Sequence, residues 1–191
     1  MDEKNTAILV LDHQNLLINN YVKDSNEHLD KVSKFLKSVR QLGISVFFVK
    51  VGFRPGFPEV SERNKIFKSV REGGRFLDTD DGSQIPESII STDSDLVVTK
   101  TRVSAFEGTE LQLLLRAQGI SQIVLFGIIT SGVVLSTVRQ AADLDYEILV
   151  LEDFCHDPSP DVQQVLLGKV LPMQATVMTS SECLDLLCEQ R

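Results

Sequence analysis

The stretch SQIVLFGIITSGVVLSTVRQA, residues 121–141, contains a predicted strand, a tight turn and a predicted helix in immediate succession. Its first part, residues 121–127, is a short apolar run of the kind that is buried on both faces of a parallel sheet. From Thr130 onward the apolar residues recur at helical spacing. A buried strand that leads directly into an amphipathic helix is the repeating unit of α/β proteins, so this stretch predicts that class.

The rest of the chain repeats this alternation. Gly43 and Gly119 are placed to end helices, and Ser180 or Ser181 is the expected N-cap of the last one. We therefore predict an α/β fold: a doubly wound (Rossmann-like), mostly parallel six-stranded sheet with helices on both faces, in a single domain of residues 1–191. The predicted buried strands are 6–11, 44–51, 95–100, 121–127, 146–153 and 174–180, and the predicted helices are 26–42, 108–119, 130–145, 157–171 and 181–191.

Residues 52–95 interrupt the alternation. They are rich in turn-forming residues, and the pair Gly73–Gly74 would end any helix there. One short helix is predicted within residues 59–74. We interpret the segment as a loop-rich excursion over the edge of the sheet, where binding loops often occur.

The charge balance bears on partners. The formal net charge of the 191-residue chain is −8, which disfavours a nucleic-acid partner. Basic residues are nevertheless dense in one segment. This cluster is either a solvated surface or a rim that attracts an anionic small molecule or a partner subunit. It consists of Lys50, Arg54, Arg63, Lys65, Lys68, Arg71 and Arg75.

The cysteine content and the N-terminus indicate location. The three cysteines, Cys155, Cys183 and Cys188, are too few and too scattered for a disulfide framework. The N-terminal segment MDEKNTAILVL lacks the layout of a signal peptide and is too short to span a bilayer. We expect a soluble, cytoplasmic protein with no membrane partner.

Two ionisable residues follow predicted strands. Asp12 comes directly after the first strand, and Lys100 ends the third. Ligands of an open α/β sheet bind beyond the carboxyl ends of its strands, so these two side chains and the turn after Gly127 would meet at one edge. Each alone has an ordinary explanation, Asp12 as a turn residue and Lys100 as a side chain that reaches water. A buried Asp–Lys pair, however, is seldom kept for stability alone, and it would hold Asp12 ionised or prepare it for proton transfer.

Three blocks resemble the isochorismatase-like hydrolase superfamily, which is also the cysteine hydrolase superfamily. They are TAILVLDHQN at 6–15, VTKTRVSAFEGTEL at 98–111 and GIITSGVVLSTVRQAADLDY at 127–146. The resemblance spans nearly the whole chain. It implies that Asp12 and Lys100 are the catalytic Asp and Lys of that family. The family's nucleophilic cysteine falls at Val133.

The valine changes the expected chemistry. An isopropyl group cannot form a thioester, so the covalent amidase route is closed. By the same resemblance, true isochorismatases also lack the cysteine and cleave a vinyl ether after protonation by the Asp. Asp12 and Lys100 would suffice for such acid chemistry, on a pocket floor that Val133 makes narrower and more apolar.

The resemblance also implies a substrate pocket around these residues. Its oxyanion hole would use backbone N–H groups of Ile129 and Val133, and the Ile128–Ile129 peptide would be cis. Nicotinamidases of the family bind a metal through an Asp and His residues after the second strand. The corresponding stretch VKVGFRPGF has no His, so we expect no metal and no cofactor. The expected substrate-binding residues are Gln14, Ser104, Phe106, Ile129, Thr130 and Val133.

The remaining candidates are weaker. His13 would point away from Asp12 because side chains alternate along an extended strand, and His28 is expected to face solvent. Cys155 and His156 are adjacent in sequence and rarely share a face, which makes Cys155 a poor nucleophile. Cys183 and Cys188 are interpreted as small apolar helix residues.

The sequence thus predicts a hydrolase that acts on a small, carboxylated molecule by thiol-independent acid/base chemistry. The alternative is a catalytically inactive small-molecule-binding or structural relative. A third possibility is an amidase that uses Cys155. By resemblance to the family, we also expect a homo-oligomer, either a dimer or a tetramer.

Overall fold

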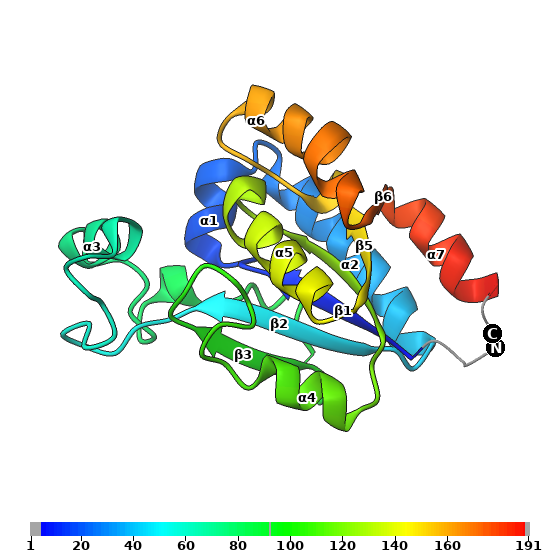
Figure 1. Cartoon of the computed structure of the whole chain (residues 1–191), viewed down its shortest axis with the longest axis horizontal. Helices are drawn as coiled ribbons and strands as arrows, with labels where there is room; N and C mark the ends of the chain where they lie inside the picture. Colours follow the sequence, from blue (N-terminus) through cyan, green and yellow to red (C-terminus); the bar gives the residue numbers. More distant parts are fainter. Residues whose placement is uncertain (1–4, 92, 190–191) are drawn as a thin grey trace.

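The computed structural model describes residues 5–91 and 93–189, and its centre is a six-stranded sheet in which every pair of neighbours is parallel (Figure 1). The strand order is β3-β2-β1-β4-β5-β6. This confirms the predicted α/β class and the parallel sheet. The strands are β1 (Thr6–Leu11), β2 (Ser45–Val51), β3 (Leu96–Lys100), β4 (Gln122–Gly127), β5 (Glu147–Leu151) and β6 (Thr176–Met178).

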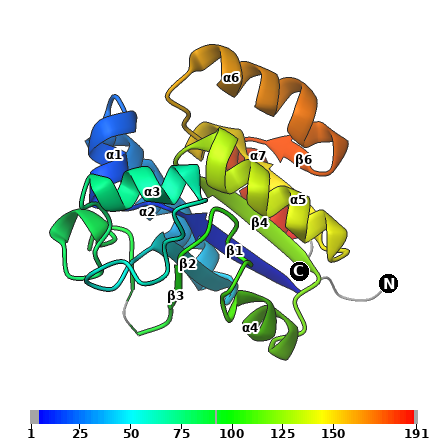
Figure 2. The same cartoon turned by 60° about the vertical axis from the view of Figure 1, so that its left-hand side comes forward.

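Helices cover both faces of the sheet. Figure 2 shows α4 (Leu111–Ala117) and α5 (Leu135–Asp143) in front of the strands, with α2 (Ser25–Gln41) and α7 (Ser180–Glu189) behind them. The helix predicted over 157–171 is not uniform. Its first part is α6 (Pro160–Val165), followed by a π-helical turn at Leu166–Val170 and a short 3-10 turn at Leu171–Met173.

The strands are not equally buried. Every residue of β1 and β4 is buried, and these two strands lie at the centre of the sheet. The prediction of six buried strands is wrong at the two edges, where β3 and β6 are partly exposed. Leu96 and Val97 of β3 are 37% and 43% exposed. An edge strand has a neighbour on one side only, so apolar composition alone does not bury it.

Two predicted helix ends are confirmed and one is corrected. Gly43 and Gly119 have φ angles of 65° and 66° just after α2 and α4, a conformation that glycine adopts without strain. The last helix is capped by Thr179 rather than by Ser180 or Ser181. The Thr179 N–H donates to Glu182 Oε2 (2.7 Å), and the Glu182 N–H donates to Thr179 Oγ1 (3.3 Å), as in a capping box.

Some predictions fall outside the described residues. The N-terminal segment MDEKNTAILVL begins with residues 1–4, and the predicted last helix includes Gln190 and Arg191. Across the described ranges, no helix is long and apolar enough to cross a membrane.

The excursion of residues 52–95 contains α3 (Lys65–Glu72), which lies within the short helix predicted at 59–74. Asn64 caps this helix by accepting the Phe67 N–H (3.2 Å). Helix α1 (Asn15–Tyr21), directly after β1, was not predicted. Figure 1 shows α3 at one end of the molecule, beyond the sheet. A second apolar cluster joins α1 and α3 and includes Leu17, Ile18, Phe53, Phe67, Val70 and Phe76.

Candidate active site

A cavity of about 450 Å³ lies beyond the carboxyl ends of the strands. The strand order reverses between β1 and β4, because β2 and β3 lie on one side of β1 and β4 on the other. A reversal of this kind leaves a crevice that is the usual ligand site of an open α/β sheet. The polar or charged side chains that line the cavity come from Asp12, Asn20, Ser69, Arg75, Lys100 and Ser131, and Tyr21 adds a phenol.

Asp12 is positioned by the chain's exit from β1. Its N–H donates to the Val49 carbonyl (2.8 Å), which continues the β1–β2 pairing one residue past the strand. Its φ angle is 53°, so the backbone turns out of the sheet here. Aspartate is one of the few residues other than glycine that tolerates this conformation. The carboxylate is buried and lines the cavity.

Lys100 reaches Asp12 from the edge of the sheet. It ends β3 in register with Val51 of β2, and β1 lies beyond β2. Neighbouring strands are about 4.8 Å apart, so the long lysine side chain is needed to cross the end of β2. Its Nζ donates to Asp12 Oδ2 (3.0 Å) and to the Arg102 carbonyl (3.2 Å). The lysine residue is 2% exposed, so the ion pair is shielded from water.

The electrostatics of the pair favour proton transfer at Asp12. Burial raises the pKa of the Asp12 carboxyl above its ordinary value, and the charge and hydrogen bond of Lys100 oppose part of that rise. Oδ2 is occupied by Lys100, whereas Oδ1 is buried and has no hydrogen-bond partner among the described residues. A buried polar atom without a partner is unfavourable. Asp12 Oδ1 is therefore the atom from which the site can give a proton to a ligand, or take one from it.

The turn after β4 forms the floor of the cavity. Ile129 has a φ angle of 73°, and residues Thr130–Val134 form a π-helical turn that leads into α5. Val133 is 2% exposed and lines the cavity with an apolar side chain at the position where the resemblance places a thiol.

Two expectations about this turn are wrong. The Ile128–Ile129 peptide is trans, and no cis peptide bond occurs in the described part of the chain. The Ile129 N–H is not free for an oxyanion, because it donates to the His156 carbonyl (2.7 Å), as does the Thr130 N–H (3.0 Å). The Ile129 N–H, which the resemblance assigned to the substrate, is therefore engaged by a segment distant in sequence.

Of the eight predicted site residues, Asp12, Lys100, Ile129 and Val133 line the cavity. Gln14 does not, because its amide holds the end of β2 against the turn at Asp81–Ser83. Its Nε2 donates to the carbonyls of Val51 and Ser83 (both 2.8 Å), and its Oε1 accepts the Val51 N–H (2.9 Å).

Ser104, Phe106 and Thr130 also lie away from the cavity lining. Ser104 Oγ donates to Gln140 Oε1 (2.6 Å) on α5, which secures the loop after β3. The Phe106 ring stacks on Tyr146 at a centroid distance of 5.9 Å. Thr130 is buried, and its Oγ1 has no hydrogen-bond partner among the described residues.

Comparison with known proteins identifies the family of this chain. The model of the isochorismatase domain family matches residues 6–182.

The chain belongs to the isochorismatase family.

Individual relatives span almost the same length. The uncharacterized isochorismatase family protein YecD of Escherichia coli O157:H7 is 30% identical over 98% of each chain. The ureidoacrylate amidohydrolase RutB of Caulobacter vibrioides is 26% identical over 95% of this chain and 91% of its own. A protein of Arabidopsis thaliana named "probable inactive nicotinamidase" is 29% identical over 83% and 84%. A solved isochorismatase family protein from Burkholderia thailandensis superposes with a TM-score of 0.82 at 26% identity, covering 96% and 95%.

In this member of the isochorismatase family, several residues that line the cavity were not predicted from the sequence. Helix α1 contributes Leu16, Leu17, Asn20 and Tyr21, and the α3 region contributes Arg75 among others. The signal for α1 was weak because its seven residues (NLLINNY) are too few to show clear helical periodicity. The density of basic residues did point to the α3 region, without showing which of them meets the cavity.

The three histidines form a chain beside the site, in which His13 and His28 are buried and His156 is half-buried. His13 Nε2 lies 3.1 Å from His28 Nε2, and His28 Nδ1 lies 3.1 Å from His156 Nε2. His28 is buried, so the expectation that it faces solvent is wrong. His13 Nδ1 lies 3.2 Å from the Leu11 carbonyl, which can only accept. In the neutral chain His13 therefore accepts from His28, and His28 accepts from His156.

Burial keeps the histidines neutral. Burial lowers the pKa of His13 to about 3 and that of His28 to about 4, and it also lowers the pKa of His156. None of the three lines the cavity. Within the described ranges, no group of three or more His, Cys, Asp or Glu side chains is arranged to hold a metal ion.

The cysteines offer no nucleophile to the cavity. Cys155 is 3% exposed, burial raises the pKa of its thiol to about 12, and it does not line the cavity. Cys183 is buried in the core, as expected for an apolar helix residue. Cys188, predicted to be similar, is exposed. A thiol that stays protonated and does not face the cavity is a poor nucleophile, so this geometry argues against the Cys155 amidase.

Proposed function

We propose that this protein is a thiol-independent isochorismatase-family hydrolase that acts on a small carboxylated molecule, with Asp12 as its general acid. The observation that carries the proposal is Asp12 Oδ1, which is buried at the cavity and has no hydrogen-bond partner in the described part of the chain, while Oδ2 is held by Lys100. The raised pKa of Asp12 supports this role, because a general acid must still hold its proton when the substrate binds.

A vinyl ether is the substrate class that such a site suits. The proton of Asp12 moves to the terminal alkene carbon, whose π electrons form the new C–H bond and leave an oxocarbenium cation. Water adds to the cationic carbon, and the proton it releases returns to Asp12. The hemiketal then breaks its C–O bond and its hydroxyl proton passes to the departing oxygen, giving an alcohol and a ketone. Lys100 stabilises the carboxylate that Asp12 becomes in the first step.

Val133 and Ile129 are compatible with this route. Protonation at carbon needs neither a thiol nor an oxyanion hole, so the isopropyl group of Val133 and the occupied Ile129 N–H do not obstruct it.

A second candidate function is ligand binding without turnover. The engaged Ile129 N–H favours it, since the amidase members of the family depend on backbone donors at this turn and here one is bound to His156. The relative named "probable inactive nicotinamidase" is consistent with loss of amidase chemistry among proteins of this kind.

The test compares wild-type protein with Asp12→Asn on vinyl ethers, small amides and ureides. We expect vinyl ether turnover that falls by roughly 10²–10⁴-fold in Asp12→Asn, the usual contribution of a general acid. Asp143→Asn, which makes the same substitution at an exposed position on α5, is the matched control and should retain full turnover. Absence of turnover for every class in the wild type, with ligand binding intact in Asp12→Asn, would establish the binding function instead.

A further inference from the structure

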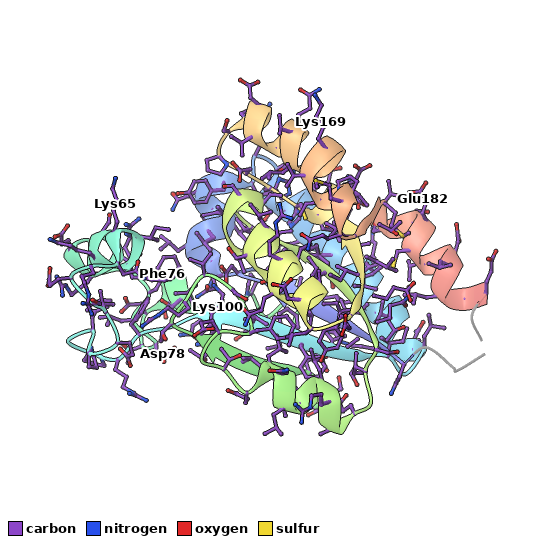
Figure 3. All side chains as sticks on the ribbon, viewed as in Figure 1. Lys65, Phe76, Asp78, Lys100, Lys169 and Glu182 are labelled. Atoms are coloured by element: carbon purple, nitrogen blue, oxygen red, sulfur yellow. The ribbon has the colours of Figure 1, made fainter. Side chains whose placement is uncertain are left out.

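The basic cluster between Lys50 and Arg75 separates into two groups in the structure. Four of its members form ion pairs with neighbouring carboxylates. Arg63 and Lys65 are exposed and do not line the cavity, and Figure 3 shows Lys65 extending outward from α3. The ion pairs are Lys50–Asp78 (3.3 Å), Arg54–Glu59 (3.3 Å), Lys68–Glu62 (3.3 Å) and Arg71–Glu62 (2.5 Å).

Arg75 differs from all of these. It lines the cavity, and no acidic side chain of the described residues forms an ion pair with it. Among the described residues, Arg75 makes one hydrogen bond, from Nη2 to the Ser69 carbonyl (3.3 Å). Most of the guanidinium donors are therefore available to a ligand. Figure 3 shows the next residue, Phe76, between α3 and Lys100 at the end of β3.

Gly73 leaves room for the Arg75 side chain. A Cβ atom at position 73 would lie 2.9 Å from Arg75 Nε, closer than real Cβ atoms approach such a neighbour. The φ angle of Gly73 is −83°, so the backbone itself does not require glycine there. A side chain at position 73 would therefore force the Arg75 side chain to move from the position that it occupies.

The charge balance of the cavity favours an anion. Among the residues that the structure describes, Asp12 is the only acidic one that lines the cavity, and its charge is paired with that of Lys100. Arg75 then leaves one uncompensated positive charge when Asp12 is ionised, and Asp12 protonation leaves a second. The remaining wall is mostly apolar, with Leu16, Leu17, Val51, Ile66, Phe67, Val70, Phe76, Val103, Ile129 and Val133.

We propose that Arg75 is the specificity-determining residue of this cavity and that its guanidinium binds the carboxylate of a monoanionic ligand. The apolar part of that ligand lies against α1 and α3. A guanidinium presents paired N–H donors that match the two oxygens of a carboxylate. The opposite end of the ligand lies toward Asp12. This assignment rests on the proposed function only in taking the cavity as the ligand site, and it names the anionic group that the substrate carries.

The test is equilibrium binding of 4-methylpentanoate and benzoate, each compared with its primary amide, by chemical-shift titration of the ¹⁵N-labelled full chain. The wild type is expected to bind each acid about tenfold more tightly than its amide, as a charge-assisted hydrogen bond from the exposed Arg75 guanidinium allows. Arg75→Gln should lose that preference, and Gly73→Ala, which displaces the guanidinium without removing it, should lose part of it. The amide shifts of Val70 and Phe76 report whether the probe enters this cavity.

Arg71→Gln is the matched control, because Arg71 lies only four residues earlier, on α3, pairs with Glu62 and does not line the cavity. It should keep the wild-type preference. Equal binding of acid and amide to the wild type, failure of both acids to bind, or an equal loss in Arg71→Gln and Arg75→Gln would overturn the proposal.

Failure here is separable from failure of the proposed function, since the titration needs no turnover. A lost preference in Arg75→Gln with no turnover in any variant would keep the anion site and remove the hydrolase. Vinyl ether turnover that depends on Asp12, with an unchanged preference in Arg75→Gln, would do the reverse.

Discussion

Lys100 Nζ lies 3.0 Å from Asp12 Oδ2, although 88 residues separate them along the chain. Both side chains are buried, and the lysine crosses the end of β2 to make the contact. A buried ion pair contributes little net stability, because desolvation of two charges offsets their attraction. Its presence at the cavity therefore supports the role proposed for Asp12.

Removing only Lys100 should be strongly destabilising. Lys100→Met leaves the Asp12 carboxylate buried without a counter-charge, and the free energy of unfolding should fall by about 3–5 kcal/mol. The double variant Asp12→Asn/Lys100→Met should be more stable than the sum of the single effects predicts. Urea unfolding of the four proteins measures this coupling, and strictly additive effects would contradict a direct interaction.

Val133→Cys should introduce a reactive thiol into the cavity. The new thiol would face the cavity near Lys100, and a nearby cation favours the thiolate. In a Cys188→Ser background, we expect iodoacetamide to modify position 133 much faster than Cys155 or Cys183, whose thiol pKa values burial raises to about 12. Peptide mapping after timed labelling gives the rates. Labelling of Cys155 at an equal rate would show that the turn does not face the cavity as described.

Stability should decrease in acid because of the histidine chain. The folded-state pKa values of His13 and His28, about 3 and about 4, lie below the ordinary value of 6.5, so folding favours the neutral rings. Their contribution is fully present above pH 6.5 and is lost as the pH falls toward 4 and then 3. Protonated His28 would also direct an N–H at the N–H of His156.

His28→Gln separates this effect from the titration of carboxylates. The variant should be less stable at pH 7, because His13 and His156 lose a partner, yet its unfolding free energy should fall less between pH 6.5 and 4. Urea midpoints at a series of pH values give the comparison. Parallel curves for the two proteins would show that the chain does not control the acid sensitivity.

Gly127→Ala should disturb the floor of the cavity. A Cβ atom at position 127 would lie 2.7 Å from both the Cβ and the carbonyl oxygen of Leu11, where β1 and β4 run side by side. We expect a loss of about 1–3 kcal/mol in unfolding free energy, typical of overpacking, and weaker binding at the adjacent Asp12. Gly168→Ala is the control, since a Cβ there meets nothing within 4 Å, and it should be neutral or slightly stabilising.

Local patterns in the sequence were sufficient for the six strands and for most of the helices. Apolar runs such as residues 6–11 and 122–127 and the glycines that end α2 and α4 act within a few residues, so the strands and helices could be located from composition and spacing. The rule that ligands bind at the carboxyl ends of parallel strands is then enough to predict that Asp12 and Lys100 lie at one edge of the sheet.

Helix α1 and the exposure of β3 could not be predicted in this way. The seven residues of α1 are held by their packing against the cluster that includes Phe53 and Phe76. The exposure of Leu96 and Val97 depends on β3 being the edge of the sheet. The formation of α1 and the exposure of β3 both depend on which segments become neighbours in the fold. Local patterns in a single sequence do not predict those neighbours.

By itself, then, the sequence determined the α/β sheet, the Asp12–Lys100 edge and a turn with no thiol at Val133, because each follows from residue type, from strand ends that local patterns locate, and from the rule that ligands bind at one edge of a parallel sheet. Only the tertiary structure decided that the Ile129 N–H is bound to the His156 carbonyl, and that Arg75 alone of the seven basic residues between Lys50 and Arg75 lines the cavity. The physical reason is that a hydrogen-bond donor or a charge is free or engaged according to groups that lie far away along the chain.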